Sequence, residues 1–389
     1  MRHRVVGRSV ITLALGAGMA SCAAGQPAGV SSGIEIAFDA AAARATLDAL
    51  AGKPSLDAEA AAGLPGNVRM VAQQHRFDPE ATEARLVESL RQAAAGGPIA
   101  PDTFMLGRRA KPRLAATRTM LAHIEENPRA LADDIRQRIR RYTPPDLKFS
   151  VQVYFVIGGT SDGFADGGVF CVALDYFGDD EAGLRTMMAH ELFHAAFDAG
   201  QEAAPKKAPT RKLSKDAERV LPLLEQTMNE GIASRVGDPT KVTDGKAWIE
   251  WFQGKFNKNF ERMVSNFVLF DTILAREYRD PKAPIDDLYN IGFSGTYDSA
   301  LYFVGYEMAR VIEEQDGPEA VVRLAWAGPI DFFSRYVAIS KAHPDEVPHR
   351  FGTETERIIE KMARAARPSP GRDRPAAVRI PAAANLSAG

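Results

Sequence analysis

His190, Glu191 and His194 form an H-E-x-x-H pattern within residues 180–199, a stretch that favours a helix. In a helix the two histidines are one turn apart and point the same way. Two imidazoles on one face can bind one Zn²⁺ ion, and Glu191 is then placed to act as general base on the water that zinc activates. Acidic residues at the start of the stretch suit a helix N-terminus, and Gly200 is expected to end the helix. The pattern therefore predicts a half-buried helix that carries a zinc site.

A third protein ligand is required, because a catalytic zinc keeps three protein ligands and one open position. The positions three and six after His194 are Phe197 and Gly200, where the metzincin pattern has glycine and histidine, so that class is excluded. Residues 229–233, N-E-G-I-A, resemble the N-E-x-x-A/S segment of thermolysin-like and M1-type peptidases. The resemblance implies that Glu230 is the third metal ligand, with Glu225 as the nearest competitor.

The segment Y-F-V-G that begins at Tyr302 resembles the Y-x-x-G segment of M1-type enzymes. In those enzymes the tyrosine hydroxyl stabilises the oxyanion of the tetrahedral intermediate, a task that suits a neutral hydrogen-bond donor. Tyr302 is the expected catalytic donor, and Tyr297 is the other candidate. The alternative is that Tyr302 and Tyr306 form an aromatic pair at i,i+4 spacing in a packed helix.

Residues 148–317 together resemble a gluzincin-type zinc metallopeptidase of the MA clan, and in particular bacterial zinc-dependent peptidases with the pattern H-E-L-x-H … E-G-x-A. The resemblance implies hydrolysis of peptide bonds in a peptide or protein substrate. No G-x-M-E-N segment precedes the motif, so the amine-binding feature of M1 exopeptidases is missing. Ser234 stands where thermolysin-like enzymes carry an aspartate that orients a zinc ligand. Asp198 and Asp238 are the candidates for that supporting role.

The start of the chain predicts export. Residues 1–21 combine a basic beginning, an apolar run and small residues, as in a secretory signal peptide. The four residues that end at Cys22, M-A-S-C, resemble a bacterial lipobox, in which Cys22 becomes the lipidated first residue of the mature protein. The alternative is cleavage after Ala23 or Ala24. The expected localisation is therefore a membrane-anchored lipoprotein or a periplasmic or extracellular protein.

The remaining chain divides by its composition into a linker (22–33), a helical N-terminal layer (34–146), a zincin-like metallopeptidase domain (147–366) and a disordered tail (367–389). The predicted fold class is α+β and mostly helical, with a small sheet beside the motif helix and an all-helical C-terminal subdomain. Helices are expected at 40–52, 58–62, 67–74, 79–95, 111–127, 130–142, 246–280, 298–315, 318–326, 330–341 and 353–366.

Two strands, at 149–157 and 169–174, are expected to lead into the motif helix, with a loop at 160–168 between them. Residues 168–174 are predicted to be the edge strand that pairs with an extended substrate, unless the strand is purely structural. Residues 201–216 read as a polar surface loop. The aromatic residues of 246–280 suit a packed core better than a ligand cage, although some could line a specificity pocket.

Composition narrows the function further. The 389 residues are 45% hydrophobic and 25% charged with a formal net charge of −2, which is typical of a globular protein and gives no support for a nucleic-acid partner. Two alternatives to a peptidase stay open at this point. One is an exported binding or scaffold lipoprotein with a vestigial metal site, and the other is a zinc amidase that acts on cell-wall material.

Overall fold

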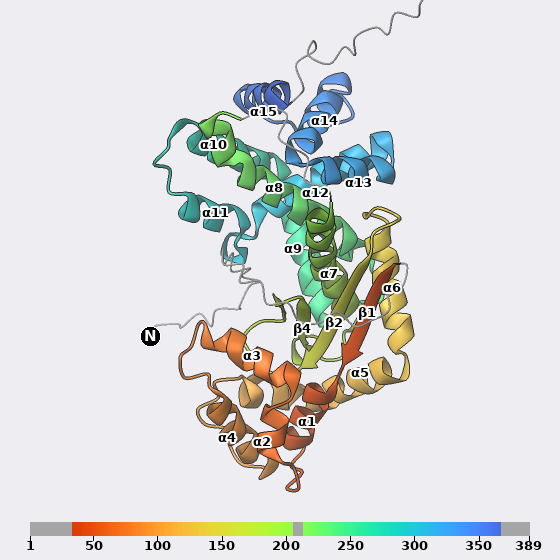
Figure 1. Ribbon diagram of the computed structural model, residues 1–389, viewed down its shortest axis with the longest axis vertical. Helices are drawn as coiled ribbons and strands as arrows, with labels where there is room; N and C mark the ends of the chain where they lie inside the picture. The colour runs from red at the N-terminus through yellow and green to blue at the C-terminus, as the bar shows by residue number, and fades with distance from the viewer. Residues whose placement is uncertain (1–32, 205–212, 367–389) are drawn as a thin grey trace, which may run out of the picture.

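The computed structural model describes residues 33–204 and 213–366, and it places a small β-sheet between two groups of helices (Figure 1). The four strands are β1 (Ile34–Asp39), β2 (Phe149–Val156), β3 (Gly163–Asp166) and β4 (Val169–Ala173). The fold is therefore α+β and mostly helical, as the sequence predicts. The predicted signal peptide, Cys22, the linker up to residue 32 and the tail from 367 lie outside the described residues. Residues 205–212, half of the loop predicted at 201–216, also lie outside them, and residues 201–203 and 215–216 are helical instead.

Between residues 33 and 148, six α-helices precede β2, and they form the orange and yellow parts of Figure 1. These helices are α1 (Ala41–Leu50), α2 (Ala58–Ala62), α3 (Pro65–His75), α4 (Glu83–Ala94), α5 (Leu114–Glu126) and α6 (Pro128–Arg140). The fourth begins later than the predicted Pro79. Asp78 holds a turn by accepting a hydrogen bond from the Glu80 amide, and Thr82 caps the helix by accepting from the Arg85 amide.

In the part of the chain that the structure describes, nine α-helices follow the sheet. They are α7 (Glu181–Ala203), α8 (Lys215–Val236), α9 (Ala247–Glu261), α10 (Met263–Arg279), α11 (Ile285–Phe293), α12 (Ala300–Asp316), α13 (Pro318–Ala327), α14 (Pro329–Ala342) and α15 (Thr353–Ala366). The predicted helix at 246–280 is two helices that meet at Arg262, and α11 was not predicted. None of the described helices combines the length and the apolar character that a membrane crossing needs.

Single turns of 3-10 or π helix connect several of these elements. They lie at Leu106–Ala110, Lys111–Arg113, Leu174–Tyr176, Pro239–Lys241 and Gly295–Tyr297. The predicted helix at 111–127 accordingly begins as a 3-10 turn and becomes α-helical at Leu114.

The sheet has the order β1-β2-β4-β3, with β1, β2 and β4 parallel and β3 antiparallel to β4. Two predictions are corrected here. β1 lies in the stretch predicted to be helical, where Ile34, Ile36 and Phe38 alternate with other residues at the period of a strand. It pairs with β2, so the sheet joins residues on both sides of the boundary predicted at 146/147.

β3 is the second correction, since it lies in the stretch predicted to be a loop. Gly167 and Gly168 both have positive φ values, +56° and +81°, and form the two-residue turn between β3 and β4. β4 is therefore an inner strand, paired on both sides, and the predicted edge position of residues 168–174 is wrong. The edge next to the motif helix belongs to β3, which contacts α7.

Helices cover both faces of the sheet. Gly66 of α3 lies against Val156 of β2, whereas Ile36 of β1 faces Ala132 of α6. Ile36 pairs with Val151 of β2, so the two side chains share one face of the sheet. Residues 151 and 156 are an odd number of positions apart in the strand, and their side chains therefore point to opposite faces. The sheet is thus buried between α3 and α6, and the carboxyl ends of β2 and β4 lead toward the motif helix.

Candidate metal centre

Helix α7 carries the H-E-x-x-H pattern, and Asp180 fixes where this helix begins. The buried Asp180 carboxylate accepts a hydrogen bond from the Gly183 amide in the first turn of α7 and others from the Lys246 and Ile249 amides at the start of α9. One side chain therefore caps α7 and ties α9 to it. Gly200 does not end α7. It is buried against Leu147, and the helix continues to Ala203.

Helix α8 brings Glu230 to the same place. Ser214 caps this helix by accepting a hydrogen bond from the Ala217 amide, as the sequence suggests. At the other end, a Cβ atom on Gly237 would lie 2.8 Å from Cβ of His190 and 2.6 Å from the carbonyl oxygen of Thr186. The glycine thus allows the end of α8 to contact α7 closely beside His190.

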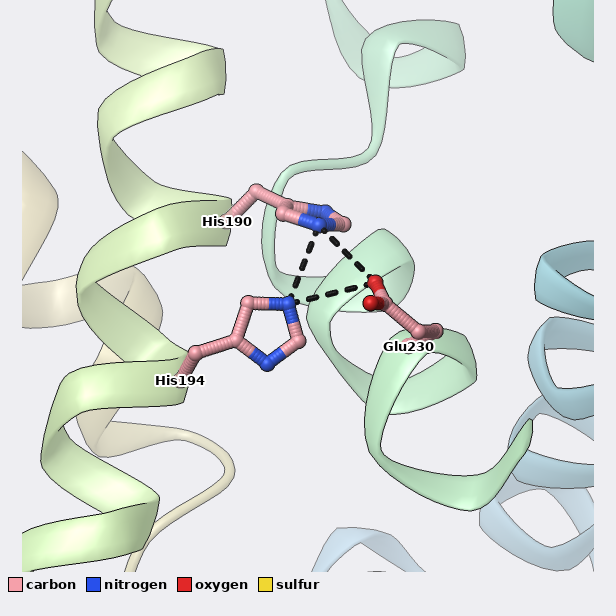
Figure 2. Close-up of side chains that lie close together, drawn as sticks. All are labelled: His190, His194 and Glu230. Atoms are coloured by element: carbon pink, nitrogen blue, oxygen red, sulfur yellow. Dashed lines mark hydrogen bonds and ion pairs between the residues drawn. The ribbon is translucent and has the colours of Figure 1, made fainter. Parts of the chain in front are cut away.

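His190, His194 and Glu230 converge, as Figure 2 shows. The Oε2 atom of Glu230 lies 3.4 Å from Nε2 of His190 and 3.2 Å from Nε2 of His194. The two Nε2 atoms are 3.2 Å apart. His190 and Glu230 are buried, and His194 is partly buried. The three residues form a possible metal-binding triad with one donor atom from each.

The spacing of the three atoms fits tetrahedral zinc. With metal–ligand bonds of about 2.0–2.1 Å, tetrahedral ligands lie roughly 3.3 Å from one another, and the three observed distances are 3.2–3.4 Å. The buried Oε2 of Glu230 has no hydrogen-bond donor among the residues that the structure describes. A carboxylate oxygen and two imidazole nitrogens facing one another are acceptors that a shared cation satisfies.

The pKa values show how strongly these groups interact. Burial alone would raise the pKa of Glu230, but His194 and His190 outweigh it and the pKa is lowered. Burial alone would lower the pKa of His194, but Glu230 outweighs it and raises the value to about 9. Without a metal, the triad therefore holds a proton next to an ionised carboxylate.

Glu191 and Tyr302 lie beside the triad. Burial raises the pKa of Glu191, and the histidines oppose this. The Tyr302 ring is stacked on His190, with centroids 6.3 Å apart and an interplanar angle of 7°. Burial, followed by the charges of Glu230 and Glu191, raises the pKa of Tyr302 well above 10, so its hydroxyl stays a neutral donor. Tyr297, the other candidate, is 50% exposed.

A contact between two glycines brings Tyr302 to the triad. A Cβ atom on Gly305 of α12 would lie 1.9 Å from the Thr227 carbonyl oxygen of α8, and one on Gly231 would lie 2.1 Å from the carbonyl carbon of Gly305. The backbones of α8 and α12 are thus in direct contact. Gly231 follows Glu230 and Gly305 is three residues after Tyr302, so the contact sets these side chains against each other.

The supporting residues predicted for the histidines lie elsewhere. Asp238 accepts hydrogen bonds from the hydroxyls of Tyr306 and Thr240, and Asp198 is exposed. Asp198 is close enough to raise the pKa of His194, although no hydrogen bond joins them. Nδ1 of His190 has no hydrogen-bond partner among the described residues. Glu225, the competitor for the third ligand, is exposed.

A small cavity opens beside His190, Glu191 and Tyr302. It measures about 30 Å³, room for roughly one or two water molecules. Several aromatic residues of the predicted amphipathic stretch line it, namely Trp248, Phe252 and Phe256. Sequence reasoning missed two charged residues, one that lines this cavity and one that lies near Glu191. Lys255 lies among those aromatic residues, and Asp162 lies just before β3, near enough to Glu191 to have its own pKa raised, by burial and then by Glu191, to about 6.

Comparison with known proteins assigns a family but no close relative. Residues 59–345 match the model of a family described as "Putative zinc dependent peptidase (DUF5700)". Neither the curated proteins nor the solved structures include a significant match to the chain. The matched region contains the whole triad together with Glu191 and Tyr302.

Proposed function

The chain belongs to this zinc-dependent peptidase family, and from that premise we propose that it is a gluzincin-type enzyme that hydrolyses peptide bonds. His190, His194 and Glu230 are the proposed zinc ligands, and residues 147–366 the proposed catalytic domain with a zincin-like core. The observation that carries the proposal is the convergence of three donor atoms at distances that suit tetrahedral zinc. When bound, zinc supplies Lewis-acid activation of a water molecule and of the substrate carbonyl.

Glu191 is the proposed general base. It takes one proton from the attacking water as the new C–O bond forms, and it delivers that proton to the leaving nitrogen as the C–N bond breaks. The raised pKa of Glu191 supports both halves of this cycle, because a base with a pKa nearer to neutrality is also a usable acid.

Tyr302 is the proposed oxyanion donor. Its hydroxyl stays protonated and can donate a hydrogen bond to the carbonyl oxygen as that oxygen gains negative charge. The stacked contact with His190 holds the ring beside the triad. An extended substrate would add to the free edge of β3, the strand that contacts α7, in place of the inner strand expected from the sequence.

The proposed function is tested with Glu191→Gln, which keeps the size and removes the base. Hydrolysis of a mixed peptide pool should fall at least about 100-fold, with zinc content equal to that of the unchanged chain. Equal hydrolysis by both chains would refute the base assignment. Zinc binding without hydrolysis of any peptide by the unchanged chain would favour a binding protein with a vestigial site, and cleavage of muropeptides alone would favour an amidase.

We also propose export, with Cys22 as a lipid anchor. The support is the pattern of residues 1–22. Cells that express the chain should incorporate labelled fatty acid into it, and Cys22→Ser should abolish the label. The second cysteine, Cys171, is buried and serves as an internal control. Equal labelling of both chains would contradict the anchor.

A further inference from the structure

Lys255 of α9 reaches the cavity that contains His190, Glu191 and Tyr302. Its Nζ atom donates a hydrogen bond to the Ser299 hydroxyl at 3.2 Å. Asp180 joins the starts of α7 and α9, so the position of Lys255 relative to the catalytic helix is fixed by the fold. The side chain is only partly exposed, and its surroundings on α9 are aromatic.

Among the residues that the structure describes, Lys255 has no ionic partner. Within 4.0 Å of its Nζ atom, the described residues place no carboxylate oxygen. The nearby Asp298 is paired with Lys258 and Arg262 instead. Burial lowers the pKa of Lys255, while the more distant charges of Asp298, Glu230 and Asp162 oppose this shift. A partly dehydrated ammonium with one protein hydrogen bond is a costly arrangement that a bound anion would relieve.

The turn before α12 is built to support this lysine. Asp298 and Ser299 both have left-handed backbone angles, with φ of +64° and +53°, a conformation that is unfavourable for residues other than glycine. Ion pairs from α9 to Asp298, and the hydrogen bond from Asn259 Nδ2 to its carbonyl oxygen, hold the turn. The buried Ser299 stands at the N-cap of α12 but makes no capping bond, and its hydroxyl serves Lys255.

We propose that Lys255 is a specificity residue that binds a carboxylate of the substrate next to the scissile bond, either an acidic side chain or the terminal α-carboxylate. This inference rests on the proposed peptidase function. The cavity has room for a carboxylate group, aromatic residues line it, and Lys255 is the cation at its side. Glu230 cannot serve as the counterion when it ligates zinc, which leaves the ammonium available to the substrate.

The test uses the zinc-loaded chain and paired peptides. Each pair differs only in Glu against Gln at one position, or in a free C-terminus against an amide. The carboxylate member should have a kcat/KM at least about tenfold higher. Lys255→Met keeps the bulk of the stem and should reduce this ratio to about one, with cleavage of the neutral members within about twofold of the unchanged chain. Lys255→Arg should restore part of the preference.

Lys246→Met is the matched control. It removes the same charge from the start of the same helix, where Lys246 is exposed and paired with Asp179, and it should leave the ratio unchanged. A preference in the Glu/Gln pairs identifies an acidic side chain, and one in the acid/amide pairs identifies the α-carboxylate. A ratio near one in the unchanged chain would overturn the proposal, as would an equal loss on both members in Lys255→Met, which would indicate a role in the reaction itself.

Failure of the peptidase function is distinguishable from failure of the inference. If no peptide is cleaved by the zinc-loaded chain, the proposed function fails. Calorimetric binding of the same paired peptides to the Glu191→Gln chain then decides the carboxylate preference alone. Tighter binding of the carboxylate member that is lost with Lys255→Met supports the role of Lys255, and equal binding of both members overturns it.

Discussion

Two carboxylates on the helix pair α8–α12, Glu230 and Glu313, have lowered pKa values in different surroundings. Burial would raise the pKa of Glu313, but hydrogen bonds and charges from Arg235, Arg141 and Tyr142 lower it to about 2. One Oε atom accepts from Arg235 at 2.6 Å and from Tyr142 at 2.9 Å, and the other pairs with Arg141. Glu313 is thus satisfied by donors of the protein itself.

Glu230 differs, because its Oε2 atom has no such donor among the residues that the structure describes. Its Oε2 atom faces Nε2 of His190 and of His194, and without a metal only a shared proton relieves the crowding of these acceptors. The comparison teaches that a lowered pKa alone does not identify a functional carboxylate. The two carboxylates differ in their neighbours. Glu313 is surrounded by hydrogen-bond donors, as in a structural cluster, whereas Glu230 faces other acceptors, as is typical of a metal site.

The largest expected effect is on zinc binding. His194→Ala removes one of three ligands and should weaken zinc binding by at least about 1000-fold. The zinc-free chain should also unfold at a lower urea concentration, because the lost imidazole holds the proton that faces the buried Glu230 carboxylate. Competition with a chelator measures the affinity. Retained affinity would mean that the triad is a structural cluster like that of Glu313.

A different result is expected for Glu313. Glu313→Ala removes the closer of the two carboxylates that pair with the partly buried Arg235, the other being Asp238 at 3.6 Å, and should lower the free energy of unfolding by about 3 kcal/mol. Zinc per chain should stay unchanged. Urea unfolding and metal analysis of the same sample check both parts. A loss of zinc at unchanged stability would erase the distinction between the two clusters.

The close contact between α8 and α12 affects both the stability of the helix pair and the position of Tyr302 beside the triad. Gly305→Ala places a methyl group against the Thr227 carbonyl and should destabilise the fold by about 2 kcal/mol, because the helices must separate. It should also lower kcat, since Tyr302 moves away from the triad. Gly254→Ala on α9 is the control, because a Cβ atom there meets no atom within 4 Å. Equal behaviour of the two variants would contradict the close contact.

The smallest expected effect is a difference in pH dependence between the Glu230 triad and the Glu313 cluster. The pKa of His194 is raised to about 9 without zinc, so zinc must displace a proton, and affinity should fall about tenfold per pH unit from 8 to 6. Glu313 has a depressed pKa, so its stabilising contribution is present above its unfolded value of 4.5 and is lost as pH falls toward 2. Between pH 8 and 6 the urea midpoint of the zinc-free chain should instead rise while the zinc affinity falls, because the raised pKa of His194 stabilises the fold more as pH falls from about 9 toward the unfolded value of 6.5. Parallel changes would contradict this assignment.

Local patterns allowed much of the fold and the three residues of the possible metal-binding triad to be predicted. The helices 41–50 and 353–366 and the strands β2 and β4 follow from periodicity and capping, and Glu230 follows from a short motif. β3 was missed because a four-residue strand that contains glycine has little propensity of its own and forms by pairing with β4. Gly200 was misread because its role is packing rather than capping.

Lys255 was missed for a different reason. Its relation to the site depends on the left-handed turn at residues 298–299 and on the ties that Asp180 makes between α7 and α9. These are contacts between distant parts of the chain, and no residue spacing in the sequence reveals them. The triad residues on two adjacent helices could be predicted from motifs, but the surroundings of the cavity beside them could not.

The most direct test of the metal centre is zinc per chain, measured by elemental mass spectrometry on the unchanged protein, on Glu230→Gln and on Glu225→Gln. Glu230 is buried in the triad and Glu225 is exposed on the same helix, so the two variants differ only in position. We expect about one zinc per chain in the unchanged protein and in Glu225→Gln, and much less in Glu230→Gln. No zinc in the reconstituted unchanged protein, or full zinc in Glu230→Gln, would contradict the proposed site.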